Sequence, residues 1–423
     1  MNRSKTICLN MIVKDEAHII RDTLTKLLQK IKIDFWVICD TGSSDATKEI
    51  IQSFFEEQGI SGELYDCEWH NFAHNRSLAL KYAFRKSDYV FVWDADDEIV
   101  GDLQLPSLKA DWYSFQFSND CSVQYKRPQL FKNSIKWTYK SVLHEYATTE
   151  EKVGPQIYID GRYHCVSGRT SNRNKDANKS LKDACILDAA YHKAIEEKDD
   201  LHTRYAYYCA RSYQDCGEGV RALEFYKKVL GHGGWSEEKY NSCIAIFSLY
   251  KSLNQVEEGL GYLVKARSYN PKRAEWIFYL VQHYCYKDPA IAYAYYTLFQ
   301  SYYEKEYDTS HMQNWLFANR SVQEFQLAYY MIIVCERTKN YQTGADLCAL
   351  ICKFKSTAIT EFFLNNWIYN MQYFKLYLPK STHFFDELHT YHQILSEKSI
   401  QVVGKQVQIL QDLYALRNAD QSA

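Results

Sequence analysis

The sequence predicts an α/β domain followed by an all-α region. The chain has 423 residues, which at roughly 150 residues per domain corresponds to two or three domains. Short apolar runs alternate with helical patterns in the first part, whereas only helical patterns remain after about residue 180. Glycine and proline are scarce, at 16 and 6 residues. We therefore expect long helices in the second part.

The first part contains three apolar runs that are typical of buried strands, at residues 6–13, 35–40 and 89–93. A helical pattern at residues 16–31 separates the first two runs. The second run is followed by SSD at residues 43–45, which can cap another helix. This alternation predicts a parallel sheet with helices between its strands. In such sheets, ligands bind at the carboxyl ends of the strands.

Helical repeats are predicted in the second part. Ala222 and Tyr226 of one unit align with Gly259 and Leu263 of the next, an offset of 37 residues. Tetratricopeptide repeats have a period of about 34 residues and place aromatic, small and proline residues at fixed positions. In the second unit the aromatic, small, small and proline positions are Tyr250, Gly259, Ala266 and Pro271, and in the first unit Ala210, Tyr213 and Ala222 fall at matching repeat positions. We expect stacked helix pairs that share one continuous core.

These patterns divide the chain into four parts. The α/β domain covers residues 1–165, and a basic linker with a connecting helix covers 166–198. Helical repeats cover residues 199–340, and further helices cover 341–423. The linker region has two interpretations, a solvated connection or a cationic flap over an anionic ligand. The basic residues of the joining stretch, from residue 162 to residue 182, are Arg162, Arg169, Arg173, Lys175, Lys179 and Lys182.

Overall charge and cysteine content exclude several classes of protein. Lys and Arg number 50 and Asp and Glu 52, a net charge of -2, so no basic field exists for nucleic acid or an anionic membrane. No apolar run reaches the roughly 18 residues of a membrane span. The 13 cysteines form no CxxC pair and no short-spaced Cys/His quartet, which indicates reduced thiols. We expect a soluble cytoplasmic protein without a transmembrane segment.

The strongest local signal for chemistry is WDADDE at residues 93–98, where an apolar strand runs into four acidic side chains. Paired carboxylates in a DxD arrangement suit Mg²⁺ or Mn²⁺, and the cation can neutralise a diphosphate. The bland alternative is a solvated acidic turn. Polar groups also follow the other strands, with KDE at residues 14–16 and DTGSSD at residues 40–45. Arg76 precedes an Ala/Leu-rich helix and could bind an anion.

Together these motifs resemble the family 2 glycosyltransferases, which have the GT-A fold, a Rossmann-like nucleotide-sugar domain. The likeness rests on ICLNMIVKDE at residues 7–16, DTGSSD at 40–45, FAHNR at 72–76 and WDADDE at 93–98. It is closest to a subgroup in bacteria and large DNA viruses in which this domain precedes tetratricopeptide-like helices. In a virus, the expected location is the host cytoplasm.

The resemblance implies roles for individual residues. Asp40 would contact the nucleotide base and Arg76 would lie beside the nucleotide. Asp94 and Asp96 would be the DxD pair that faces the ribose and the metal. The basic residue Lys14 and the acidic residue Glu16 would line the same edge of the sheet.

Two further roles fall on the segments VLHE at residues 142–145 and YHC at residues 163–165. Glu145 is the candidate base, and His164 is the candidate third metal ligand, with His144 as the fallback. The Gly-Tyr that often follows the metal histidine in bacterial relatives is missing after His164.

The predicted reaction is the inverting transfer of a sugar from a nucleotide sugar, a UDP-sugar, to a glycan or protein acceptor. Mn²⁺ or Mg²⁺ at Asp94, Asp96 and His164 would stabilise charge on the leaving diphosphate, and Glu145 would deprotonate the acceptor. The helical repeats could hold a protein partner or a second copy of the chain. We expect no nucleic-acid partner.

Two alternatives remain open at this stage. The first is a tetratricopeptide-type scaffold with an inactive transferase domain. The second is a nucleotidyltransferase, which would normally carry a Gly-rich loop after its first strand. Here that position reads VKDE at residues 13–16.

Overall fold

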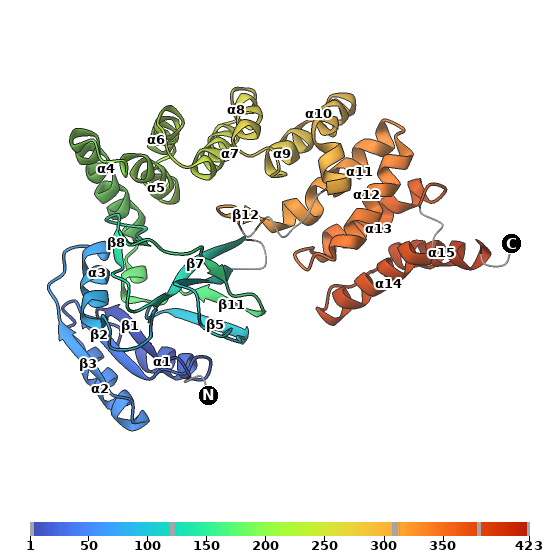
Figure 1. Ribbon diagram of the computed structural model, residues 1–423. Helices are drawn as coiled ribbons and strands as arrows, with labels where there is room; N and C mark the ends of the chain where they lie inside the picture. Colours follow the sequence, from blue (N-terminus) through green and yellow to red (C-terminus); the bar gives the residue numbers. More distant parts are fainter. Residues whose placement is uncertain (1–3, 119–122, 307–311, 313, 379–381, 421–423) are drawn as a thin grey trace. The chain divides into compact units, whose positions relative to one another are not determined.

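A mixed β-sheet lies at the centre of the first part of the chain (Figure 1). The computed structural model describes residues 4–118, 123–306, 312, 314–378 and 382–420. The strand order is β3-β2-β1-β4-β7-β6-β11-β5. The strands are β1 (Ile7–Val13), β2 (Phe35–Asp40), β3 (Gly62–Asp66), β4 (Tyr89–Val92), β5 (Asp97–Asp102), β6 (Trp112–Ser118), β7 (Val123–Lys132) and β11 (Arg162–Ser167).

The first four strands form the parallel half of the sheet. β1 pairs in parallel with β2 and β4, and β2 pairs in parallel with β3. The three strands predicted from apolar runs are confirmed, whereas β3 lacks such a run and is not predicted. Three helices connect these strands, α1 (Ile20–Leu28), α2 (Thr47–Gln58) and α3 (Phe72–Ala83).

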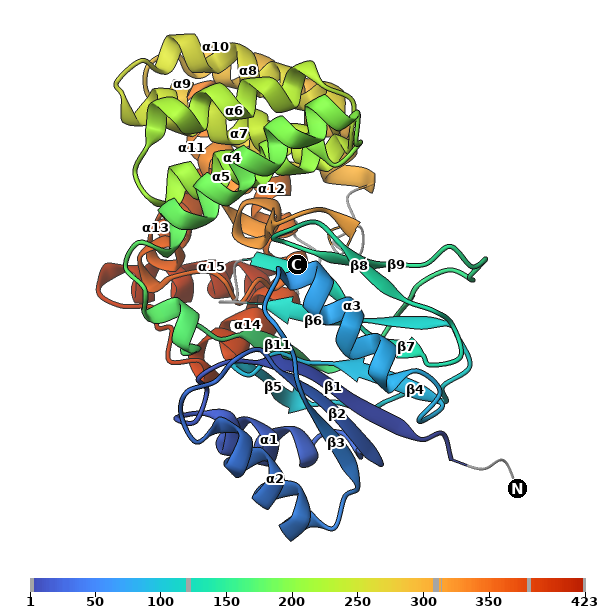
Figure 2. The same cartoon turned by 90° about the vertical axis from the view of Figure 1, so that its left-hand side faces the viewer.

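Side chains of β1 alternate between two helical layers. Ile7, Leu9 and Met11 share one buried cluster with residues of α1 and α2. Cys8 belongs to a second cluster that contains Leu80 of α3. This is the period of two expected for a strand buried on both faces. Figure 2 shows α3 on one face of the sheet and α1 and α2 on the other.

The remaining strands extend the sheet with mixed directions. β7 runs antiparallel to β4, and β11 runs antiparallel to β5 while pairing in parallel with β6. A short strand β10 (Ile157–Tyr158) also pairs with β6. A separate hairpin consists of β8 (Thr138–Lys140) and β9 (Tyr146–Thr148). The loop of this hairpin carries the predicted base, Glu145.

The chain separates into two units, which we describe individually. The first comprises residues 1–119 and 125–238, and the second comprises residues 120–124 and 239–423. The first unit therefore contains helices as well as the sheet: α4 (Lys179–Glu197), α5 (His202–Asp215) and α6 (Gly219–Gly231). It extends beyond residue 165, where the sequence suggested a boundary. Helix α7 (Ser236–Ser252) begins in the first unit and continues into the second.

Helices make up nearly all of the second unit. They are α8 (Val256–Tyr269), α9 (Glu275–Tyr284), α10 (Pro289–Ser301), α11 (Leu327–Arg337), α12 (Tyr341–Phe354), α13 (Glu361–Met371), α14 (Thr382–Glu397) and α15 (Lys405–Asp420). A short strand β12 (Ala318–Asn319) pairs with residues 123 and 124. The predicted all-α character of this region is confirmed.

The residues that define the predicted repeat lie at equivalent positions. Ala222 and Tyr226 are buried on α6, and Gly259 and Leu263 are buried on α8. Small residues at such positions let neighbouring helices approach closely. At Gly259, an added Cβ would lie only 3.1 Å from the Phe247 ring. Assignment of these helices to the tetratricopeptide class remains a prediction.

Two observations concern the whole described part of the chain. None of its helices is long and apolar enough to cross a membrane. The twelve described cysteines are all free thiols.

We predict that Asn10→Ala destabilises the first unit. Asn10 is 1% exposed, and its side-chain amide donates to the carbonyls of Val37 in β2 and Ala79 in α3. Losing these hydrogen bonds should cost about 2 kcal/mol, or about 4–8 °C in apparent Tm. Thermal unfolding measures the effect. Asn178→Ala, at an exposed position just before α4 with no side-chain cap hydrogen bond, is the control, and equal Tm values for the two variants would contradict the prediction.

Candidate active site

A cavity of about 910 Å³ lies at the carboxyl ends of β1 and β4. The segment that follows β11 covers part of it. The lining residues are Ile12, Val13, Lys14, Glu16, Thr41, Trp69, Phe72, Arg76, Asp94, Ala95, Asp96, Tyr125, His144, Ser167, Gly168, Arg169, Ser171, Asn172, Arg173, Asn174, Asp176, Lys179 and Lys182. The structure thus brings five predicted site residues and the fallback His144 to one cavity, at the edge where parallel sheets bind ligands.

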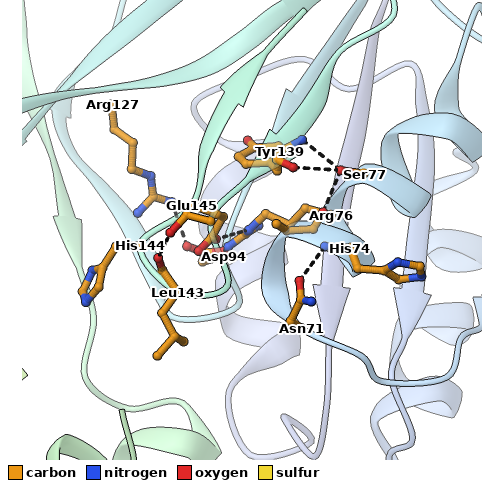
Figure 3. A network of polar contacts seen from close by, with 12 residues as sticks. Asn71, His74, Arg76, Ser77, Asp94, Arg127, Tyr139, Leu143, His144 and Glu145 are labelled. Carbon is orange, nitrogen blue, oxygen red and sulfur yellow. Dashed lines mark hydrogen bonds and ion pairs between the residues drawn. The ribbon is translucent and has the colours of Figure 1, made fainter. Parts of the chain in front are cut away.

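Arg76 links two of the predicted carboxylates (Figure 3). It lies in the first turns of α3, and its side chain is 9% exposed. Its Nη2 donates to Asp94, and its Nε donates to Glu145 Oε1 at 2.6 Å. Burial opposes the charge, but the two carboxylates outweigh burial and raise the pKa of Arg76 well above its usual value. Arg76 is therefore a permanent cation between the strand end and the hairpin loop.

A second arginine completes this network. Arg127 of β7 donates from Nη2 to Asp94 at 2.7 Å and to Asp97 at 2.8 Å. Although burial opposes ionisation of Asp94, the two guanidinium groups lower its pKa. Burial raises the pKa of Asp97, and Arg127 only partly compensates. Both oxygens of Asp94 therefore contact arginine.

The other acidic groups contact the segment after β11. Asp96 Oδ2 accepts hydrogen bonds from the Ser171 backbone at 3.1 Å and from the Asn174 side chain at 3.2 Å. Glu16 accepts a hydrogen bond from the Asn172 backbone at 3.3 Å. Burial, followed by the charge of Asp96, raises the pKa of Glu16 to about 7. Gly168 permits this approach, because a Cβ there would lie 1.9 Å from the Asp96 carbonyl oxygen.

Asp40 lies beside the cavity, at the end of β2. It is 1% exposed, and its Oδ1 accepts from the backbone N–H groups of Gly42 and Ser43 at 2.9 and 2.7 Å. Its Oδ2 is buried without a partner among the described residues. A buried acceptor of this kind is costly unless a ligand donates to it. The adjacent Thr41 lines the cavity.

The basic segment lies at the cavity rather than away from it. Arg169, Arg173, Lys179 and Lys182 all line it. Arg173 lies 4.7 Å from the centre of the Phe72 ring and pairs with Asp183. Arg169 is exposed and forms no ion pair with any described residue. This placement favours the cationic-flap interpretation over a simple linker.

The two candidate histidines lie in different places. His164 lies on β11 opposite Val100, three residues before the Ser167 position that pairs with Asp97. At about 3.3 Å per residue, this is about 10 Å along the strand, and His164 does not line the cavity. His144 does line it, and its ring stacks on Tyr208 at 4.0 Å. Across the described residues, no three His, Cys, Asp or Glu side chains cluster as a metal site.

Sequence reasoning missed Arg127, Ser171 and Asn174. Arg127 follows Tyr125 in β7 at strand spacing, and one isolated arginine in a strand carries no sequence signal. Ser171 and Asn174 belong to a polar segment with several equivalent residues. Only the folded chain identifies which of them contact the acids.

Comparison with known proteins identifies the domain that holds this cavity. Residues 8–175 match Glycosyl transferase family 2. Residues 8–175 therefore form a family 2 glycosyltransferase domain, which confirms the resemblance drawn from the motifs. A search of the curated proteins found no match.

Three solved structures show partial similarity. The mannosyltransferase PcManGT from Pyrobaculum calidifontis, with GDP-Man and Mn²⁺, is 13% identical, with 64% of this chain and 88% of that chain covered and a TM-score of 0.34. S. aureus TarS with UDP-GlcNAc is 13% identical, with coverage of 71% and 93% and a TM-score of 0.30. A tetratricopeptide repeat protein from Parabacteroides merdae is 10% identical, with coverage of 56% and 92% and a TM-score of 0.30.

We predict a pH-dependent effect of Glu16→Gln. Because the pKa of Glu16 is raised to about 7 in the folded chain, the unfolded chain holds fewer protons there between about pH 4.5 and pH 7. The free energy of unfolding of the unmodified chain therefore falls as the pH rises through this window, because Glu16 loses its proton, whereas glutamine has no proton to lose. The stability of Glu16→Gln relative to the unmodified chain should rise by about 2 kcal/mol between about pH 5 and pH 8.

Thermal unfolding at both pH values measures this difference. Glu56→Gln, an exposed position on α2, is the control and should show no change with pH. A Glu16→Gln effect that is independent of pH would contradict the raised pKa.

Proposed function

We propose that this chain transfers a sugar from a UDP-sugar to an acceptor hydroxyl of a glycan or protein, with inversion at the anomeric carbon. The main support is the ion-pair network in which Arg76 joins Asp94 to Glu145 at the cavity of a family 2 domain. The network joins a carboxylate that follows β4 to one on the β8–β9 hairpin loop. Arg76 and Asp94 line the donor cavity, and Arg76 holds Glu145, which does not line it, beside this cavity.

The donor would bind along the strand ends. Asp40 Oδ2, buried without a partner among the described residues, would accept a hydrogen bond from an N–H of the base. Lys14, Arg169 and Lys179 line the same cavity and would attract the diphosphate. Charge-assisted contacts of this kind are the stronger class of hydrogen bonds.

The residues around Asp96 suit a divalent cation that is shared with a diphosphate. Mg²⁺ is commonly held by one or two carboxylates together with substrate phosphates. Asp96 uses Oδ2 for the segment after β11, and the nearby Glu16 carboxylate faces the same cavity. We therefore propose Asp96 as the direct protein ligand of Mn²⁺ or Mg²⁺ and Asp94 as the residue that faces the ribose. A bound cation would stabilise negative charge on the leaving diphosphate.

Glu145 is proposed as the base. Its Oε1 accepts from Arg76, an ion pair with the ionised carboxylate, and a base must be ionised to take a proton. The acceptor oxygen attacks the anomeric carbon as its proton passes to Glu145, and the bond from that carbon to the diphosphate breaks. The products are the glycosylated acceptor and UDP. Attack opposite the leaving group inverts the anomeric configuration.

We predict metal-dependent UDP binding that requires Asp96. Titration calorimetry of the full chain with UDP should show binding with Mn²⁺ that Asp96→Asn weakens at least about tenfold. Asp102→Asn, an exposed carboxylate on β5, is the control and should bind like the unmodified chain. Absence of UDP binding in all proteins would contradict the proposal and favour a scaffold with an inactive domain.

We predict that Glu145→Gln loses turnover and keeps UDP binding. Glutamine can still accept a hydrogen bond from Arg76 but cannot take a proton, so the rate should fall at least about 100-fold. UDP release from UDP-glucose, UDP-galactose and UDP-N-acetylglucosamine measures turnover, and calorimetry measures binding. Glu150→Gln, exposed beyond β9, is the control. Unchanged turnover in Glu145→Gln would exclude Glu145 as the base.

A further inference from the structure

A second cavity, of about 850 Å³, lies at the β8–β9 hairpin and is lined entirely by the first unit. One side is the hairpin, and the other is formed by the α4–α5 connection, the start of α5 and the residue that precedes α7. The lining residues are Asn71, Ala73, Tyr139, Lys140, Ser141, Val142, Tyr146, Lys198, Asp199, Asp200, Leu201, Thr203, Arg204, Tyr205, Trp235 and Glu238. None of these residues has a role in the proposed donor site.

Aromatic side chains with accessible surface distinguish this cavity. Trp235 is 47% exposed and Tyr146 is 39% exposed, and Tyr139 and Tyr205 also line it. Aromatic rings supply flat apolar faces, and tyrosine and tryptophan add a hydrogen-bonding edge. Exposed aromatics gathered in one cavity are characteristic of binding sites rather than of a packed core.

The charges of this cavity balance. The cavity is lined by three cationic residues, Lys140, Lys198 and Arg204, and by three acidic residues, Asp199, Asp200 and Glu238. Arg204 Nη1 pairs with Glu238 at 3.2 Å. A polymer of phosphates or acidic residues needs an excess of positive charge, which this cavity lacks. Its polar groups include both donors and acceptors, which match hydroxyl groups.

A third cavity shares lining residues with both sites. It measures about 340 Å³ and shares Asn71 and Val142 with the second cavity. It also shares Trp69, Phe72, Arg173, Asp176, Lys179 and Lys182 with the donor cavity. The hairpin provides a shorter link, because the Arg76 guanidinium that pairs with Glu145 lies 5.8 Å from the centre of the Tyr139 ring. Tyr146, which directly follows Glu145 in the chain, lines the second cavity, so a ligand there can approach the proposed base.

We propose that this second cavity binds an uncharged oligosaccharide, the acceptor whose reacting end reaches Glu145. A sugar ring has an apolar face of C–H groups that stacks on an aromatic ring and a rim of hydroxyl groups that pair with mixed donors and acceptors. Trp235 and Tyr146 provide the stacking faces, and Arg204 and Asp200 provide polar partners at the rim. This inference rests on the proposed function and narrows the acceptor from a glycan or protein to a neutral glycan.

Saccharide binding by the full chain tests the inference. The probes are chitotetraose, maltotetraose and mannotetraose, each added with UDP and Mn²⁺, and the readout is ligand-observed NMR. At least one probe should bind, and Trp235→Ala and Tyr146→Ala should each weaken it at least about tenfold. Phe362→Ala, an exposed aromatic on α13, is the control and should bind like the unmodified chain. UDP binding, measured on every protein, confirms that each variant is folded.

Two results would overturn the inference while the proposed function stands. The first is UDP binding by the unmodified chain without binding of any of the three saccharides. The second is saccharide binding that both variants retain. Failure of UDP to bind would contradict the proposed function instead, and saccharide binding that depends on Trp235 would still support the second cavity as a glycan site.

Discussion

The buried guanidinium of Arg76 is the constraint on which the site depends. It lies between carboxylates from two separate elements, Asp94 at the end of β4 and Glu145 in the hairpin loop. Removing a buried cation from such a pair leaves uncompensated charge, which typically costs about 3–5 kcal/mol. The arginine thus holds the two carboxylates close together. Because it comes from α3, the packing of that helix on the sheet sets the distance between the strand end and the loop.

Pairing of buried acidic groups with nearby donors also shapes the rest of the cavity wall. Four acidic side chains gather at one sheet edge, and each is offset by a specific partner. Asp94 and Asp97 share Arg127, whereas Asp96 and Glu16 rely on hydrogen bonds from residues 171–174. Backbone N–H groups offset negative charge less completely than a guanidinium does. Asp94 contacts two guanidinium groups and its pKa is lowered, whereas burial raises the pKa of Asp97, which contacts one guanidinium, and of Glu16, which accepts from a backbone N–H.

The parallel half of the sheet and the acidic residues at its edge were predictable because each is marked by a short, continuous stretch of sequence. A buried strand is an apolar run, and the acidic motif follows such a run directly at Asp94. The environment of Glu145 was not predictable, because it depends on Arg76, which lies 69 positions away in the sequence. For His164 the motif position suggested a metal ligand. The strand register instead places His164 opposite Val100, away from the cavity. Register is a property of pairing, and one sequence does not reveal it.

The helices of the first unit are structurally part of the transferase. Arg204 of α5 donates from Nη2 to the His144 carbonyl at 2.8 Å and lies 5.0 Å from the centre of the Tyr146 ring. Ser141 and His144 have positive φ angles of 84° and 53°, which are strained for residues other than glycine. A loop with such backbone angles is stable only when contacts from its surroundings fix it. Here α5 provides such a contact through the hydrogen bond from Arg204 to the His144 carbonyl. A boundary at residue 165 would separate the proposed base from the helix that fixes its loop, so α5 must remain with the sheet for the hairpin to present Glu145.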